Sequence, residues 1–240
     1  MTLDGMEQAV LSAVPRRSRV NFVRYADDFV VTGKSKSVLV NLVRPAIERF
    51  LAIRGLQLSA EKTVITHITD GFTFLGQTFR KRGNVLHITP SAEGVRAVIE
   101  KVGMLIRRYR SAPIEALIRK LNQILRGWAN YHRHVVASRA FSRVDTYVYE
   151  QLWRMVRRRH PQKSRGWLIR RYWSAAGRKW TFAVNRTHAS GNKLYQVLRV
   201  CTIGIRRHIK VRADAHPYAP EFSEYLKERR RARGAPVFEV

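Results

Sequence analysis

The spacing of apolar residues changes once along this chain, at Pro90, and this change constrains the fold most strongly. Before Pro90, short β-prone runs are separated by turn residues, with one helical stretch among them. After it, apolar residues recur every three to four positions, which predicts helices. The β-prone runs cover residues 20–32, 63–68, 72–79 and 85–89, and the helical stretches cover residues 35–55, 91–109, 113–132 and 139–159. The sequence therefore predicts an α+β fold, with antiparallel hairpins plus a helix, then a helical bundle, then a basic C-terminal module.

Positive charge gathers in the second part of the chain. In total, 46 Lys and Arg stand against 17 Asp and Glu, which gives a formal net charge of +29. Residues 1–75 hold 10 of the basic and 7 of the acidic residues, so residues 76–240 hold 36 and 10, a net +26. Such an excess repels itself unless a polyanion neutralises it, which favours nucleic acid as the partner. Apolar residues make up 45% of the chain, enough for a packed core.

Several classes of protein are excluded by what the sequence lacks. No run of about 18 apolar residues is available to span a bilayer. The first residues also lack the basic, apolar and small-residue segments of a signal peptide. We therefore expect an intracellular, cytoplasmic protein without a membrane partner. Cys201 is the only cysteine, which excludes an internal disulfide and a Cys-rich zinc site, and we expect its thiol to be buried.

Two adjacent carboxylates, Asp27 and Asp28, lie at the centre of the first predicted hairpin. Neighbouring side chains on a regular strand point to opposite faces, but a turn can direct both toward one ion. Oxygen ligands of this kind suit Mg²⁺, and a pair of Mg²⁺ ions can activate a 3′-hydroxyl and stabilise leaving pyrophosphate. For the dipeptide alone, a solvated turn is the alternative interpretation.

Three motifs around these residues resemble reverse transcriptases, in the same order along the chain. Residues 22–31 (FVRYADDFVV) resemble the YxDD hairpin, in the YADD form of group II intron enzymes. Residues 58–63 (LSAEKT) resemble the segment that follows a palm helix, and residues 72–76 (FTFLG) resemble the strand that supports the primer end. The resemblance implies a Mg²⁺-dependent enzyme, with a catalytic and metal-binding role for Asp27 and Asp28. It further implies hairpin positions and primer-support positions, namely Tyr25, Ala26, Phe74, Leu75 and Gly76.

The second part of the chain resembles the maturase-specific (X, or thumb) domain of group II intron proteins. The resemblance lies in residues 121–132 (LNQILRGWANYH) and continues through Phe141, Val144, Asp145, Trp153, residues 158–161, Trp167, residues 207–211, Asp214 and residues 216–218. It implies three domains: a partial reverse transcriptase palm over 1–89, a maturase-specific thumb over 90–160, and a basic, nucleic-acid-binding extension over 161–240.

Basic residues recur on the predicted helices and interleave with aromatic ones, a mixture that suits RNA backbone contacts and stacking on unpaired bases. The alternative for each aromatic is packing in the core, which we expect for more than half of them. The predicted RNA-binding residues are Arg107, Arg108, Lys120, Arg126, Trp128, Tyr131, Arg158, Arg159, Arg170 and Arg171. His132 and His134 are two positions apart, which a helix does not place on one face, so we do not expect a metal site there.

The chain also departs from a complete reverse transcriptase. Only nineteen residues precede Val20, and their single Asp, Asp4, lies in a segment that resembles the helix before the hairpin. We therefore expect the nucleotide-binding fingers and the third carboxylate to be absent, and no polymerase activity from this chain alone. The paired cysteines of an appended HNH nuclease are also missing.

Three functions stay open from the sequence. In the first, the chain is one half of an RNA-directed DNA polymerase, read from a truncated gene or completed by a separate upstream half. Alternatively, it is a stand-alone maturase that holds intron RNA while the RNA does the chemistry, or a truncated remnant without function. The implied partners are group II intron RNA, target DNA and the upstream reverse transcriptase half.

Overall fold

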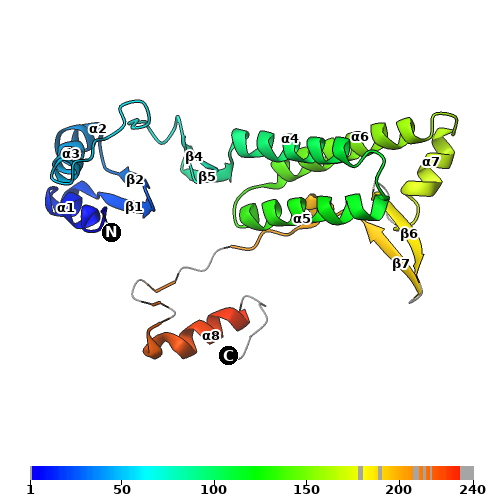
Figure 1. The fold of residues 1–240 in the computed structure, drawn as a ribbon. Coiled ribbons are helices and arrows are strands. Elements are labelled where there is room, and N and C mark those ends of the chain that lie inside the picture. Colours follow the sequence, from blue (N-terminus) through cyan, green and yellow to red (C-terminus); the bar gives the residue numbers. More distant parts are fainter. Residues whose placement is uncertain are drawn as a thin grey trace.

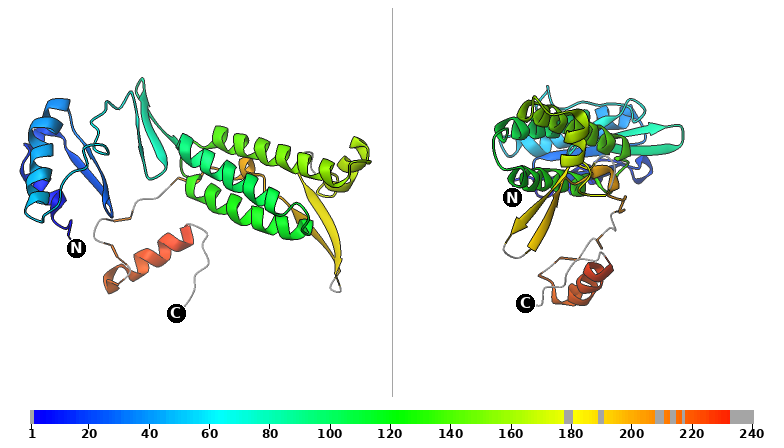
Figure 2. Two further views of the ribbon diagram at one scale, coloured as in Figure 1. Left: turned by 45° about the horizontal axis from the view of Figure 1, so that its top comes forward. Right: turned by 90° about the vertical axis from the view of Figure 1, so that its right-hand side faces the viewer.

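The computed structural model describes residues 2–177, 181–188, 191–207, 211–212, 215–216 and 218–232. Figure 1 shows the elements in a row, with α1 to α3, β1 and β2 at one end, the sheet containing β4 and β5 next, then the α4–α6 bundle, and α7, β6 and β7 at the far end. Helix α8 lies apart from the bundle in each view (Figure 2). The predicted α+β class is confirmed.

The N-terminal unit packs helices against a two-stranded hairpin. Its elements are α1 (Met6–Ser12), β1 (Asn21–Tyr25), β2 (Asp28–Thr32), α2 (Lys36–Val38), a π-helical segment (Leu39–Val43) and α3 (Arg44–Ala52). Met6 and Val10 of α1 are fully buried against Ile47 and Phe50 of α3. The Phe22 ring of β1 also joins this small core.

The helix over 36–52 changes its hydrogen bonding just before Pro45. The Arg44 N–H donates to the Leu39 carbonyl, five residues earlier, and regular α-helix resumes at Arg44. Proline has no N–H to donate to the preceding turn, and π-turns are a usual way to accommodate such a loss. The helix therefore continues through Pro45 with this local change of hydrogen bonding.

A three-stranded antiparallel sheet follows, in the order β3 (Phe72–Phe74), β4 (Gln77–Arg82), β5 (Val85–Pro90). Two expectations are wrong here. Residues 63–68 form no strand, and residues 72–79 form two strands, because the chain reverses at Leu75 and Gly76. Both turn residues have positive φ, at 48° and 69°. The turn at Asp70-Gly71 therefore joins no pair of strands, and β3 is the edge strand beside β4.

The helical bundle agrees closely with the predicted helices. It consists of α4 (Ala92–Arg108), α5 (Ile114–His132) and α6 (Ser138–Arg159). The Ser91 hydroxyl caps α4 by accepting the Gly94 N–H at 3.0 Å. Each helix directs an apolar stripe inward, and Val102, Leu121 and Leu152 are completely buried.

The bundle core continues past residue 160. The elements there are α7 (Arg165–Tyr172), β6 (Ala183–His188), β7 (Gly191–Gln196) and a 3₁₀ turn (Val200–Thr202). Leu168, Trp173, Phe182 and Val200 are buried in the same cluster as α4 to α6. The described residues between 165 and 203 thus form one packed unit with the three helices.

Two polar side chains of the bundle fasten this later segment. The Asn122 amide donates to the Gln196 carbonyl and accepts the Leu198 N–H, both at 2.8 Å. The Asp145 carboxylate accepts the N–H groups of Val200 and Cys201 at 2.8 and 2.9 Å. Cys201 is exposed, so our expectation of a buried thiol is wrong.

The last described elements are a 3₁₀ turn (Pro220–Phe222) and α8 (Ser223–Ala232). Part of the predicted C-terminal resemblance, at 208–210, Asp214 and Pro217, lies outside the described residues. None of the helices in the described part of the chain combines the length and apolar character needed to span a bilayer.

Candidate metal-ligand hairpin and nucleic-acid interface

The YADD residues occupy a tight hairpin turn. Tyr25 pairs with Asp28 at the end of the β1–β2 ladder, and Ala26 and Asp27 form the turn between them. Ala26 takes a positive φ of 55°. Both carboxylates and the Tyr25 ring are exposed, the ring to 65%. The turn thus presents Asp27 and Asp28 to solvent, where they can meet a cation and a substrate.

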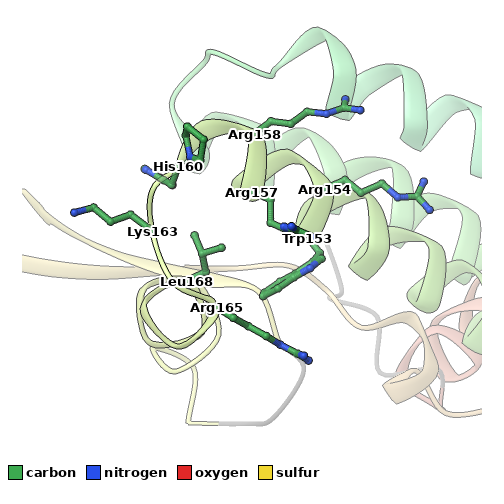
Figure 3. A pocket seen from close by; sticks show the side chains of 9 residues that line it. Trp153, Arg154, Arg157, Arg158, His160, Lys163, Arg165 and Leu168 are labelled. Atoms are coloured by element: carbon green, nitrogen blue, oxygen red, sulfur yellow. The ribbon is translucent and has the colours of Figure 1, made fainter.

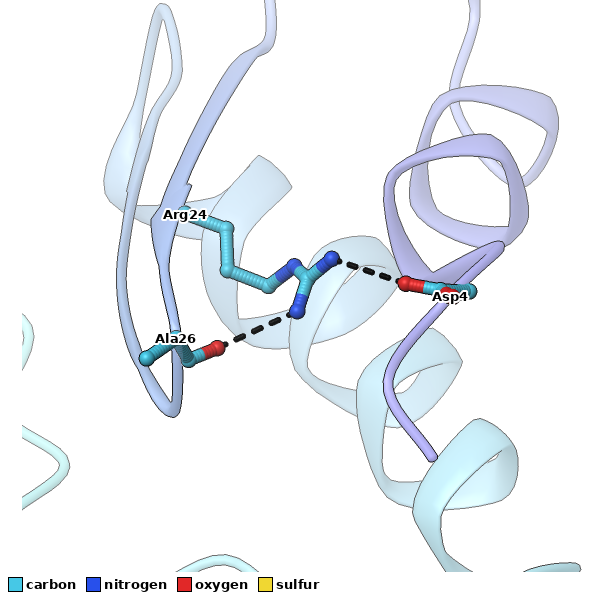
Figure 4. Close-up of polar contacts among 3 residues, drawn as sticks. All are labelled: Asp4, Arg24 and Ala26. Atoms are coloured by element: carbon cyan, nitrogen blue, oxygen red, sulfur yellow. Dashed lines mark hydrogen bonds and ion pairs between the residues drawn. The ribbon is translucent and has the colours of Figure 1, made fainter. Parts of the chain in front are cut away.

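The Arg24 side chain lies between this turn and Asp4 and contacts both (Figure 4). One guanidinium nitrogen donates to the Ala26 carbonyl at 3.1 Å, and the other donates to the Asp4 carboxylate at 3.0 Å. The contact holds the strained residue of the turn and joins the hairpin to the start of α1. Asp4 is therefore engaged by Arg24 at the side of the hairpin.

The donor set fits a divalent cation in its chemistry, because carboxylate oxygens are the ligands that such ions prefer. Within the described residues, however, no group of three or more His, Cys, Asp or Glu side chains could hold a metal ion. Two adjacent aspartates supply part of a two-metal site, which needs further ligands to hold both ions.

The predicted primer-support residues form the β3–β4 turn, and the helical domain holds that turn in place. The Tyr131 hydroxyl donates to the Leu75 carbonyl at 2.6 Å, and the Ser91 N–H donates to the Gly76 carbonyl at 2.9 Å. Beside them, the Gln77 amide and the His134 ring nitrogen lie 2.9 Å apart. Phe74 pairs with Gln77 at the base of the turn. The end of α5 therefore fixes the position of the FxFLG segment.

Two predicted RNA-binding aromatics have structural contacts. Tyr131 is half-exposed and is bound to the β3–β4 turn, as described above. Trp128 packs edge-on against His132 and Phe141, with ring centroids 5.2 and 5.4 Å away. RNA contact by either residue stays a prediction, and each of them also helps to hold the domain together.

Most of the predicted RNA-binding cations point into solvent. They are exposed, and in the part of the chain that the structure describes none of them forms an ion pair: Arg107, Arg108, Lys120, Arg126, Arg158, Arg170 and Arg171. They come from four successive helices, α4 to α7. An exposed cation without a carboxylate partner keeps its full charge available for a phosphate.

Arg159 differs from these residues. Its guanidinium donates to the carbonyls of Tyr109, Arg110 and Ala112, which lie in the α4–α5 connection. Burial lowers the pKa of this side chain. Arg159 therefore satisfies carbonyl groups at and just after the C-terminal end of α4, and RNA contact by this residue stays a prediction.

A basic groove lies where α6 meets α7 (Figure 3). It has a volume of about 910 Å³ and is lined by Trp153, Arg154, Arg157, Arg158, His160, Pro161, Lys163, Arg165 and Leu168. Of its five cations, the sequence pointed only to Arg158. Arg154, Arg157, Lys163 and Arg165 were missed because the packing of α7 against α6 brings them together, and no sequence spacing signals that packing.

His160 closes one end of the groove. Its Nε2 atom lies 2.8 Å from the Tyr172 hydroxyl. Burial lowers the pKa of His160, and the nearby charges of Arg159, Arg171 and Lys163 lower it further. At neutral pH the imidazole is therefore uncharged, and the positive charge of the groove comes from its arginines and lysine.

Comparison with known protein families matches two separate parts of the chain. Residues 1–79 match the family described as Reverse transcriptase (RNA-dependent DNA polymerase). Residues 95–173 match the family described as Group II intron, maturase-specific domain. The first match contains the YADD hairpin and the FxFLG turn, and the second contains the bundle and α7.

Several individual proteins are similar to parts of the chain. The protein YkfC of Escherichia coli is 32% identical over 119 residues, which cover 49% of this chain and 29% of YkfC. The group II intron-encoded protein LtrA of Lactococcus lactis is 28% identical over 113 residues, 45% of this chain and 17% of LtrA. A 91 kDa protein in the cob intron of Schizosaccharomyces pombe is 25% identical over 155 residues, 55% of this chain and 19% of that protein. The matched segments thus span less than a third of each relative. The chain thus contains part of a reverse transcriptase domain followed by a group II intron maturase-specific domain, and it is similar to a group II intron-encoded protein.

Proposed function

We propose that this chain binds group II intron RNA through the basic surface of its helical domain, promoting splicing. We also propose an intracellular location, of the prokaryotic cytoplasmic or the organellar type. The observation that carries the proposal is the set of exposed, unpaired cations on α4 to α7, in the region that matches the maturase-specific domain. A polyanion that contacts these side chains releases condensed counterions and gains affinity from their charge.

The YADD hairpin supports a second role in the complete protein, RNA-templated DNA synthesis during intron mobility. Reverse transcriptases use divalent metal ions, and we propose Mg²⁺ here, held in part by Asp27 and Asp28. When bound, the ion would activate the primer 3′-hydroxyl and stabilise the leaving pyrophosphate. The chain's own residues present the two carboxylates at an exposed turn, and Arg24 keeps that turn in place.

By itself, the chain should not extend a primer on an RNA template, because Asp27 and Asp28 are too few ligands for two ions. The measurement is primer extension by the purified chain with Mg²⁺. Extension that Asp27→Ala abolishes would contradict this proposal and would show that the hairpin is already part of a complete site.

RNA binding is tested by the salt dependence of affinity for a group II intron transcript. The double variant Arg107→Gln/Arg108→Gln should flatten the slope of log K against log salt by about one unit for each lost phosphate contact. The matched control is Arg16→Gln/Arg17→Gln, a second pair of adjacent exposed arginines, in the reverse transcriptase part.

The control pair should leave the slope unchanged. If Arg107→Gln/Arg108→Gln leaves the slope intact, α4 is not part of the RNA-binding surface. If the Arg16→Gln/Arg17→Gln pair flattens it equally, binding depends on charge anywhere on the chain and not on the helical domain.

A further inference from the structure

The α6–α7 groove concentrates positive charge without acidic lining residues. Among the side chains that line it there are four arginines and one lysine, and no Asp or Glu. Arg154 pairs with Glu150 outside the groove at 3.6 Å, with both side chains at least half exposed. Such a surface pair contributes less than about 1 kcal/mol and is easily exchanged for a phosphate. The other four cations form no ion pair within the described residues.

The aromatic ring of Trp153 lies among these cationic side chains. Trp153 is held by Tyr149, whose ring is stacked nearly parallel at 6.5 Å, and by the buried Trp173 at 5.1 Å. The Arg165 guanidinium lies 5.7 Å from the centre of the Trp153 ring. Figure 3 shows Trp153 and Leu168 between the cationic side chains, with Arg158 and Lys163 extending to opposite sides. The groove therefore has an apolar centre and a cationic rim.

The size of the groove limits what can occupy it. Its volume of about 910 Å³ lies in the range of roughly 300–1,000 Å³ that accommodates small molecules, so one or two nucleotides fit. A base in a duplex stacks on its neighbours and offers no free face, whereas an unpaired base can stack on an indole or a guanidinium. The cationic rim of the groove can therefore bind a phosphate while the fixed indole stacks on the unpaired base next to that phosphate.

From this arrangement we propose that the α6–α7 groove binds an unpaired nucleotide of RNA, with the base stacked on Trp153 and Arg165. The phosphates on either side lie among Arg157, Arg158 and Lys163. This inference rests on the proposed function, since it takes RNA as the ligand, and it adds that this part of the surface selects single-stranded over paired segments.

The test compares two RNAs on the full chain by fluorescence anisotropy: a labelled oligouridylate of about 12 nucleotides and a blunt RNA duplex of the same length. Trp153→Leu should weaken oligouridylate binding about tenfold and leave duplex binding within about twofold. The exposed pair Lys163→Gln/Arg165→Gln should weaken oligouridylate binding, since Arg165 stacks on the base, and should flatten its salt slope by about 0.7 for the one phosphate contact of Lys163.

Arg139→Gln is the matched control, since this exposed arginine lies on the same helix fourteen residues earlier, about 21 Å from Trp153. It should leave the ratio of the two affinities unchanged. Because Trp153 also packs on the core, the Lys163→Gln/Arg165→Gln pair decides the test if Trp153→Leu does not fold.

Each remaining outcome is decisive. If the wild-type chain binds neither RNA, the proposed function fails together with this inference. If it binds both RNAs and the groove variants bind oligouridylate as the wild type does, only the groove assignment is wrong. If the groove variants lose affinity for both RNAs equally, the groove is a general polyanion site and does not select unpaired bases. The same conclusion follows if polyglutamate displaces oligouridylate as readily as unlabelled RNA does.

Discussion

The imidazole of His132 is buried in the core, so its protonation should affect the stability of the fold. It is 3% exposed and packs edge-on against Trp128 and Tyr131. Burial lowers its pKa from 6.5 to about 4, and the charge of His134 contributes. The ring is therefore neutral at physiological pH and belongs to the core.

Stability should depend on pH through this residue. Above pH 6.5, His132 is neutral in both the folded and the unfolded chain and has no effect. Between pH 6.5 and 4 the unfolded chain takes up a proton that the folded chain does not, so stability falls. One pKa unit corresponds to about 1.36 kcal/mol, so the loss of stability reaches about 3 kcal/mol near pH 4.

Urea unfolding between pH 7.5 and 4 tests this. The change in the free energy of unfolding over this range should differ by this amount between wild type and His132→Phe. The variant His67→Gln, at an exposed histidine, should follow the wild type. Parallel curves for His132→Phe and wild type would contradict this account.

Asp27 should contribute to chemistry and not to RNA affinity. Because Asp27→Ala removes an exposed negative charge, it should leave the Kd for intron RNA unchanged or slightly lower. Filter binding at moderate salt measures this, with Arg108→Gln as the variant that weakens affinity. A Kd raised tenfold by Asp27→Ala would show that the hairpin itself holds RNA.

At the scale of elements, α5 contains a glycine that its fold does not need. Gly127 lies inside the helix, is exposed, and has no atom within 4 Å of the position that a Cβ would take. Gly127→Ala should therefore stabilise the chain by about 0.5–1 kcal/mol, because alanine favours the helix. Gly76→Ala is the contrast, since a φ of 69° makes it destabilising. The melting temperatures of the two variants test this. A lower melting temperature for Gly127→Ala than for the wild type would mean that other atoms occupy the space beside Gly127.

The attachment of residues 195–203 to the bundle should depend on the Asp145 carboxylate. Asp145→Ala leaves the N–H groups of Val200 and Cys201 without their acceptor, and hydrogen bonds to charged groups contribute about 1.5–3 kcal/mol each. We expect a loss of about 2–4 kcal/mol in urea unfolding. The control is Glu150→Ala, which removes an exposed ion pair and should cost less than about 1 kcal/mol. Equal losses in the two variants would refute the fastening role of Asp145.

The elements differ in how well the sequence predicts them. Helices α4 to α6 agree with prediction within about two residues, because their apolar stripes repeat at helical spacing and Ser91 and Pro113 mark two starts. The β3–β4 turn was missed because nothing in the sequence signals a positive φ at Leu75. The β6–β7 hairpin was missed because its strands have few apolar residues and depend on packing against the bundle.

Across the whole molecule, the net charge differs strongly between the part with the YADD hairpin and the rest of the chain. The first part, over residues 1–75, has a net charge of +3 and contains the YADD hairpin, and the remaining chain has +26. The hairpin was predictable because its residues are consecutive in the sequence. The α6–α7 groove was not, because its cations come from two helices and the connection between them.

The most direct test of RNA binding by the helical domain is photo-crosslinking of the chain to a group II intron transcript that contains 4-thiouridine, with the crosslinked peptides mapped by mass spectrometry. Crosslinks should concentrate in α4 to α7, over residues 92–172, including peptides that contain Trp153. Crosslinks confined to residues 1–79, or none above the level seen with an unrelated RNA of equal length, would contradict the account.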